Sequence, residues 1–181
     1  MAIDLAVLKA ECQNNPNGYS FTVDGVTQTL AQWFAGGFDQ VCADLLNVVD
    51  PAFNVYRTAI PVAEVFDAVT WANFTPSDAV PTADALSNAI FQSRQIACQT
   101  KQMNVQTMLM GQTTVNGSKP NIRAGLQDAL TNLPSGANGA LRSAGWVTVR
   151  DTILTRPATR AEKLYADKTN GNGGTKTTAA V

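Results

Sequence analysis

Carboxylates are the side chains that could do acid–base chemistry in this sequence, because it contains no histidine and so offers no imidazole base. Three pairs of acidic residues lie near one another along the chain: Asp4 with Glu11, Asp39 with Asp44, and Glu64 with Asp67. Each pair falls on the polar face of a predicted amphipathic helix, where solvated carboxylates are far commoner than a catalytic dyad. The sequence therefore predicts no catalytic residues, and we do not expect an enzyme.

Metal and cofactor sites are not predicted either. The three cysteines, Cys12, Cys42 and Cys98, are far apart, and each lies among apolar residues of a predicted helix, the usual setting of a buried free thiol. Without a CxxC motif or a histidine, the chain offers no set of zinc ligands. Its Gly-rich stretches, GANGA and NGNGG, lack the Lys-Ser or Lys-Thr of a phosphate loop. Free thiols fit assembly in the cytosol.

Basic residues gather in the last third of the chain, where Arg150, Arg156, Arg160 and Lys163 could lie near phosphates, since nonspecific DNA contact needs only positive charge in a groove. No aromatic residues interleave with them, so the pattern does not predict a reader of base sequence. The same residues could lie between subunits, or could form surface ion pairs, Arg160 with Glu162 and Lys163 with Asp167. The sequence leaves these interpretations open.

The surface predicted for this chain carries little charge. Only 15% of its 181 residues are charged, while 45% are apolar, against about a quarter charged in an average protein. Such a surface suits a chain packed against other chains, although a monomer of low charge fits equally well. Charge is also uneven, with a net −6 over residues 1–118 and +5 over residues 119–181. This asymmetry could draw subunits together head to tail, hold a basic face near nucleic acid, or form two solvated faces.

The first half of the chain predicts helices around one hairpin. A helix is expected over residues 3–13 and should end before Pro16. Alternating side chains on either side of Asp24-Gly25 predict a small β-hairpin at about 19–30. A short helical turn broken at Gly36-Gly37 follows. The next helix has Phe38, Leu45 and Leu46 on one side and should end at Asp50-Pro51. The segment FNVYRTA after it is expected to be extended. Pro61 is expected as the first residue of the next helix.

The second half predicts longer helices. A helix of about thirty residues should begin at Thr82. Its methionines, Met103, Met108 and Met110, could line an interface between copies or fill the core. A helix opened by Ser118 and Pro120 should follow, then a second helix over about 137–154 and a short one capped by Thr159.

The fold class predicted from these elements is mainly α: a helical bundle with one small β-hairpin and an extended C-terminal arm. The core is expected over residues 1–167. Residues 168–181 form the arm, because Asn, Gly, Thr and Lys cannot offset the entropy of ordering the chain alone. The first residues, MAIDLAVLKAECQ, lack the features of a signal peptide, and no apolar run is long enough to span a bilayer. We therefore expect a chain with no membrane partner.

Four stretches of the chain resemble small virion proteins encoded among the head and tail genes of tailed bacteriophages. They are LAVLKAECQNNPNGY, ADLLNVVDPAFNVYRTAIPVAEVFDAV, SKPNIRAGLQDAL and RPATRAEKLYA, which occur in the same order as in those relatives. In size and helical pattern the chain is most similar to the head-to-tail connector, an adaptor of the phage neck that forms a ring beneath the portal.

The resemblance implies a structural protein of the virion, assembled in the host cytoplasm as a homo-oligomeric, dodecameric ring. Its partners would be the portal protein and other neck or tail proteins, and packaged DNA would pass nearby without specific contact. The C-terminal arm would dock on the portal or on a neighbouring subunit through Lys168, Thr169, Asn170, Lys176, Thr177 and Val181. The alternatives are a tail-completion or tail-terminator protein, a capsid decoration protein, and a virion-associated cell-wall hydrolase that uses carboxylates alone.

Overall fold

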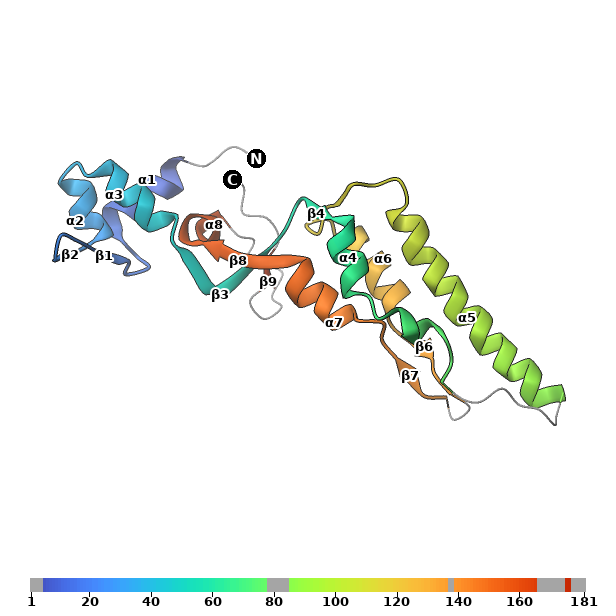
Figure 1. Ribbon diagram of the computed structural model, residues 1–181. Coiled ribbons are helices and arrows are strands. Elements are labelled where there is room, and N and C mark those ends of the chain that lie inside the picture. Colours follow the sequence, from blue (N-terminus) through green and yellow to red (C-terminus); the bar gives the residue numbers. More distant parts are fainter. Residues whose placement is uncertain (1–4, 78–84, 137–138, 166–174, 177–181) are drawn as a thin grey trace. The chain divides into compact units, whose positions relative to one another are not determined.

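The computed structural model describes residues 5–77, 85–136, 139–165 and 175–176 (Figure 1). Helical residues make up about 55% of this described part, and the strands are short pairs. The fold is therefore mainly helical with small β elements. Contacts gather into two compact units: unit 1 combines residues 1–56 with 156–181, and unit 2 contains residues 57–155.

This division differs from the single core predicted over residues 1–167. Unit 1 is discontinuous, because the segment that follows residue 155 returns to pack with the first 56 residues. A linear reading of the sequence has no local signal for such a return. Of the predicted arm over 168–181, the structure describes only Thr175 and Lys176.

Unit 1 begins with the predicted helix and hairpin. Its elements are α1 (Leu5–Asn14), β1 (Ser20–Val23), β2 (Val26–Thr29), α2 (Leu30–Ala35), α3 (Asp39–Leu46), β3 (Val49–Tyr56), β8 (Thr155–Thr159), α8 (Arg160–Tyr165) and β9 (Thr175–Lys176). The helix predicted to end at Asp50-Pro51 ends earlier, at Leu46, because these two residues belong to a strand that pairs with the C-terminal part of the chain. The hairpin turns at Asp24 and Gly25, whose φ angles of 49° and 79° are those of the tight turn that the pair favours. Thr29 then caps α2 in a reciprocal capping box with Gln32, which fixes where the hairpin ends and the helix begins.

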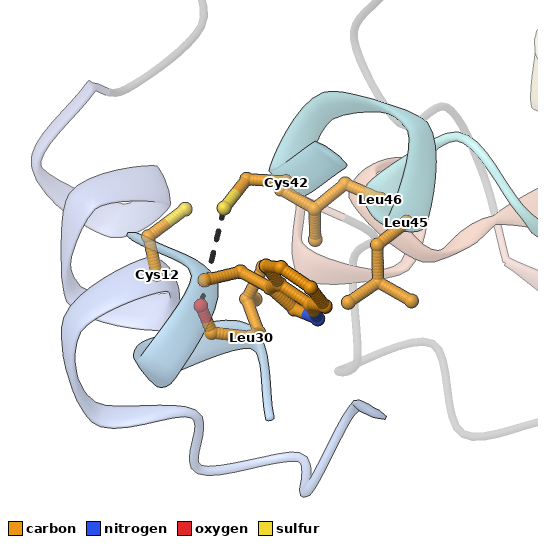
Figure 2. Packing of buried hydrophobic residues seen from close by; sticks show 6 residues of the cluster. Cys12, Leu30, Cys42, Leu45 and Leu46 are labelled. Carbon is orange, nitrogen blue, oxygen red and sulfur yellow. Dashed lines mark hydrogen bonds between the residues drawn. The ribbon is translucent and has the colours of Figure 1, made fainter. Parts of the chain in front are cut away.

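The core of unit 1 lies between α1, α2 and α3 (Figure 2). It contains Cys12, Leu30, Trp33, Cys42, Leu45 and Leu46. The Cys42 thiol lies 3.9 Å from the carbonyl oxygen of Leu30, and the Trp33 indole donates to the carbonyl of Phe21 at 3.2 Å. Because Trp33 lies under the hairpin, the two marginal strands gain an apolar support. All three cysteines are free and buried, which confirms the prediction made for them.

A three-stranded sheet completes unit 1, with β3 in the centre between β8 and β9. Strand β9 runs parallel to β3, so that Asn54 lies opposite Thr175 and Val55 opposite Lys176. Both edges of β3 are therefore covered by segments from the C-terminal part of the chain.

Unit 2 holds the long helix α5 (Ala85–Leu109). Its other elements are β4 (Ile60–Pro61), α4 (Val62–Ala68), the 3-10 turn η1 (Trp71–Phe74), β5 (Thr114–Val115), α6 (Pro120–Leu130), β6 (Leu133–Pro134), β7 (Leu141–Arg142), α7 (Trp146–Thr148) and the π-helical turn η2 (Val149–Ile153). The core of the unit contains fully buried side chains from most of these elements: Ile60, Val65, Phe74, Val105, Leu126, Leu130, Leu133, Val149 and Leu154.

Three predicted boundaries in unit 2 differ from the structure. Pro61 belongs to β4, which pairs with β5, so α4 begins one residue later. The long helix is described from Ala85, and the predicted cap at Thr82 lies outside the described residues. Lys119 occupies the N-cap of α6 rather than Ser118, while Pro120 is the first helical residue as predicted.

The helix predicted over residues 137–154 is wrong in its first half. Leu141–Arg142 form β7, which pairs with β6, and the helical segment begins only at Trp146. Gly145 precedes it at a φ of 91°, and a Cβ at this position would lie 2.5 Å from the carbonyl oxygen of Ala68. Such a backbone conformation favours glycine, so this residue separates the strand from the helix.

Candidate interface at the C-terminal helix

Helix α8 begins at a capping box that the sequence predicts at Thr159. The Thr159 hydroxyl accepts the Glu162 amide at 3.1 Å, and the Glu162 carboxylate accepts the Thr159 amide at 2.9 Å. These two bonds satisfy donors that a short helix would otherwise leave exposed. Because the box fixes the first turn, it also fixes which side chains of α8 face β3 and the N-terminal helices.

Arg156 and Glu162 form a bidentate ion pair within this box. One guanidinium nitrogen lies 2.7 Å from Oε2 of Glu162, and the other contacts Oε1. The Glu162 side chain is buried, whereas that of Arg156 is 45% exposed. The paired guanidinium holds the pKa of the Glu162 carboxyl below its usual range, against the opposing effect of burial. A buried carboxylate of this kind is stable only while its partner stays in place.

Lys163 joins α8 to the start of β3. Its Nζ donates to Oδ2 of Asp50 at 2.6 Å and lies 5.7 Å from the centre of the Phe53 ring. The hydrogen bond from Lys163 holds the pKa of the Asp50 carboxyl below its usual range, and the same bond raises the pKa of Lys163. Asp50 also accepts the amide of Ala52 at 3.1 Å, so both its charge and its position are supported.

Arg160 connects α8 to the N-terminal part of unit 1. Its guanidinium carbon lies 4.8 Å from the centre of the Tyr19 ring, within the range of a cation–π contact. Its backbone amide donates to the carbonyl of Val48 at 3.0 Å, and a guanidinium nitrogen lies 3.4 Å from that of Leu45. We call these contacts the α8 interface: Arg156, Arg160, Glu162 and Lys163 with Asp50 and Tyr19.

The predicted basic residues thus separate into two groups. Arg156, Arg160 and Lys163 lie together in the α8 interface, while Arg150 lies in unit 2 and pairs with Asp151 at 2.5 Å. The predicted pairing of Arg160 with Glu162 is wrong, because Glu162 pairs with Arg156 instead. The predicted partner of Lys163, Asp167, lies outside the described residues, and Lys163 pairs with Asp50.

Of the six residues predicted for the docking arm, the structure describes one. Lys176 belongs to β9, opposite Val55 of β3. The other five, Lys168, Thr169, Asn170, Thr177 and Val181, lie outside the described residues.

Sequence reasoning missed Tyr19 and Asp50 as members of the α8 interface, and Phe53 beside Lys163. Asp50 is 113 residues from Lys163 in the chain, and no local pattern relates two residues so far apart. The available signal was the segment ADLLNVVDPAFNVY itself, in which an acid and an aromatic residue occur beside a predicted extended stretch.

Glu64, one of the carboxylates weighed for catalysis, forms an ion pair with Arg57 in unit 2. Arg57 contacts both carboxylate oxygens of Glu64, at 2.5 and 3.1 Å, and also donates to the carbonyl of Ile153 at 3.2 Å. The hydrogen bond from Arg57 holds the pKa of Glu64 below its usual range. General acid catalysis needs the opposite shift, so the environment of Glu64 is that of a structural carboxylate.

The described residues contain no group of three or more histidine, cysteine or acidic side chains that could hold a metal ion. A recess of about 490 Å³ in unit 2 is lined by one charged residue, Lys119, and otherwise by neutral side chains such as Met108 and Ile122. No described helix combines the length and apolar character needed to cross a bilayer.

Comparisons with protein-family models, with curated proteins and with solved structures find no match to this chain. The α8 interface must therefore be interpreted from its own chemistry. The pKa values of both of its carboxyl groups, on Asp50 and Glu162, are lowered. The interface fixes α8 to the rest of unit 1 through two ion pairs and a cation–π contact.

Proposed function

We propose that this chain is a structural subunit of a tailed-phage particle, a connector that forms a homo-oligomeric ring at the neck and joins the portal to the tail. In this role it has no catalytic residues and no cofactor, and DNA passes the ring without specific contact. The resemblance of four sequence segments to small virion proteins supports this proposal, which includes assembly in the host cytoplasm, a dodecameric ring and the predicted helical-bundle arrangement of the core.

Three of those four segments supply the residues of the α8 interface. LAVLKAECQNNPNGY contributes Tyr19, ADLLNVVDPAFNVY contributes Asp50, and RPATRAEKLYA contributes the basic residues and Glu162. The features on which the resemblance rests are thus the features that hold the C-terminal segment in place. This agreement favours a role in which the position of that segment matters.

The observation that carries the proposal is the addition of β9 to β3. Strand addition, in which an extended segment pairs with the edge of a sheet, is a common way for one protein to hold a tail of another. Here Thr175–Lys176 pair with Asn54–Val55 of the same chain. In a ring, the edge of β3 could accept the same segment from a neighbour, and the segment released by its own unit could reach the portal.

Copurification with the portal of the same phage tests the proposal. The full chain, a chain truncated after Asp167 and a Lys9→Ala variant would be mixed with portal particles and imaged by negative stain. We expect the full chain to add a ring at the narrow end of the portal and the truncated chain to add none. Lys9→Ala is the control, since Lys9 is an exposed residue of α1 outside the predicted arm and its loss should leave the ring in place.

Two other outcomes would overturn the neck assignment. If the full chain fails to bind the portal but sediments with tail tubes, a tail-terminator role replaces the connector. If it sediments with capsids, a decoration role does. A hydrolase would instead release peptidoglycan fragments, and this activity would disappear in Glu64→Gln.

A further inference from the structure

The outer face of α5 carries no charge. Over its 25 residues the helix has only two charged side chains, Arg94 and Lys101, and both are partly buried. Large apolar side chains lie in solvent instead, including Leu86 at 69%, Ile96 at 63% and Met103 at 64% exposure, and Met110 at 72% just beyond the helix end. An uncharged face of this length with several exposed apolar side chains is unusual on the surface of a single chain.

These exposed residues follow a heptad spacing. Counting along the helix in alternating steps of three and four reaches eight positions, all exposed: Leu86, Ala89, Ser93, Ile96, Thr100, Met103, Thr107 and Met110. We call this set the α5 seam. A repeat of 3.5 residues is the pattern of a helix that packs along its length against another helix. The flanking positions 92, 99, 104 and 106 are Gln and Asn, so neither side of the seam adds charge.

The opposite face of α5 serves unit 2. Phe91, Cys98, Val105 and Leu109 are buried, and the helix packs there against α6, β6 and η1 (Figure 1). The seam is therefore a second, separate apolar stripe, and no described part of the chain covers it.

We propose that the α5 seam binds the α5 seam of a second copy of this chain, with the two helices antiparallel. A second copy is favoured because the seam is complementary to itself. In a twofold contact both copies use the same patch, so a patch of one sign of charge would repel its copy, whereas the uncharged seam does not. The large and small side chains of the seam also alternate in a way that fits the same seam running in the opposite direction. In an antiparallel pair the dipoles of the two helices also point in opposite directions, which is the favourable arrangement.

Side-chain size favours one register. With the twofold axis at the level of Cys98, Ser93 faces Met103 of the other copy, Thr100 faces Ile96, and Thr107 faces Ala89. The first two pairs place a large side chain against a small one, which is how packed layers interdigitate. Leu86 then faces Met110 at each end, so the two most exposed apolar side chains of the seam meet at the rim.

The size of the contact predicts a reversible dimer. A helix of 25 residues is roughly 37 Å long and about 10 Å wide, so the seam covers about 400 Å² on each copy. The two copies together would bury about 800 Å², which is below the roughly 1,200 Å² at which stable specific interfaces begin. We therefore expect a weak, transient dimer whose population rises with protein concentration. The proposal does not rest on the neck function, since it concerns the free protein.

Disulfide trapping tests the register directly. Ser93→Cys and Met103→Cys would be made as separate variants of the full chain, mixed and oxidised mildly. We expect a crosslinked dimer from the mixture and little from either variant alone. Wild type is the control, because its three cysteines are buried. Crosslinks within either single variant would indicate parallel helices and overturn the proposal, as would the absence of any crosslink.

A charge substitution tests the same surface without added thiols. Met103→Glu places a carboxylate in the seam, whereas Val147→Glu changes an apolar residue of similar exposure, 59%, in α7 of the same unit. In sedimentation velocity over a concentration series, Met103→Glu should weaken association at least tenfold and Val147→Glu should leave it unchanged. Wild type that stays monomeric at the highest concentration, or equal loss in both variants, would overturn the proposal. Portal binding can fail or succeed independently of either result.

Discussion

Replacing Glu162 by glutamine should destabilise unit 1 through a single charge. Glutamine has nearly the same shape and still fits a capping box, so the substitution removes the charged hydrogen bonds to Arg156 and little else. Hydrogen bonds to charged groups contribute about 1.5–3 kcal/mol. Arg156 is 45% exposed, and solvent screening reduces this value, so we expect Glu162→Gln to lower the free energy of unfolding by about 1–2 kcal/mol at pH 7.

The stability lost in Glu162→Gln should become smaller as the pH falls. The folded state lowers the pKa of Glu162, so its stabilising contribution is complete above the pKa of an unfolded glutamate, about 4.3, and disappears as the pH falls through the lower folded-state pKa. Other paired acids titrate in the same range, but they are shared by wild type and variant. The difference between the two proteins therefore isolates Glu162.

Urea unfolding followed by circular dichroism at pH 7 and at pH 3 measures both quantities. A second pair of proteins, Arg156→Gln and the double variant, completes a mutant cycle, in which Glu162→Gln should cost little once Arg156 is gone. The reasoning fails if Glu162→Gln costs less than about 0.5 kcal/mol at pH 7, the range of an ordinary surface substitution. It also fails if the difference between wild type and variant persists at pH 3.

Three further changes have defined outcomes. Gly145→Ala should lower the free energy of unfolding by more than about 2 kcal/mol, because Gly145 has a φ of 91° and a Cβ there would lie 2.5 Å from a backbone carbonyl oxygen. Gly136→Ala is the control: a Cβ there meets nothing within 4 Å, so its free energy of unfolding in the same urea titration should not change. Asp50→Asn should cost about 0.5–1 kcal/mol, since it neutralises one partner of a partly exposed ion pair with Lys163, and thermal unfolding at neutral pH would detect this. The three thiols, whose pKa values are raised by burial, should react with a disulfide reagent at least about a hundredfold more slowly in the native chain than in urea, and rapid labelling of the native chain would contradict their burial.

Local patterns predicted the elements that local forces determine. The hairpin follows from alternating side chains and an Asp24-Gly25 turn, and the start of α8 follows from Thr159 with an acid three residues later. The helix predicted over 137–154 failed for the complementary reason. Leu141 recurs at helical spacing, but pairing with Leu133–Pro134 and the positive φ of Gly145 decide its conformation, and neither is visible in the periodicity.

The partners in the ion pairs of the α8 interface could not be predicted from local sequence patterns either. Helical spacing suggested partners within α8, because i to i+4 pairs are the pairs that a sequence displays. The structure instead pairs Lys163 with Asp50 of β3 and Arg156 with Glu162 across the capping box. The first partner depends on how a distant strand returns to the C-terminal segment, which is a property of topology rather than of local sequence.

The two proposed contacts require different symmetries, and this difference constrains assembly. A ring with one polarity is built from head-to-tail contacts, whereas antiparallel pairing of α5 is twofold. Within one ring of a single polarity, the subunits cannot make the twofold α5 contact with one another in addition to the head-to-tail contact. The α5 pair must therefore either join two rings back to back or dissociate when subunits enter the ring. The small area available to the seam favours dissociation, because a weak contact is readily displaced by a larger one.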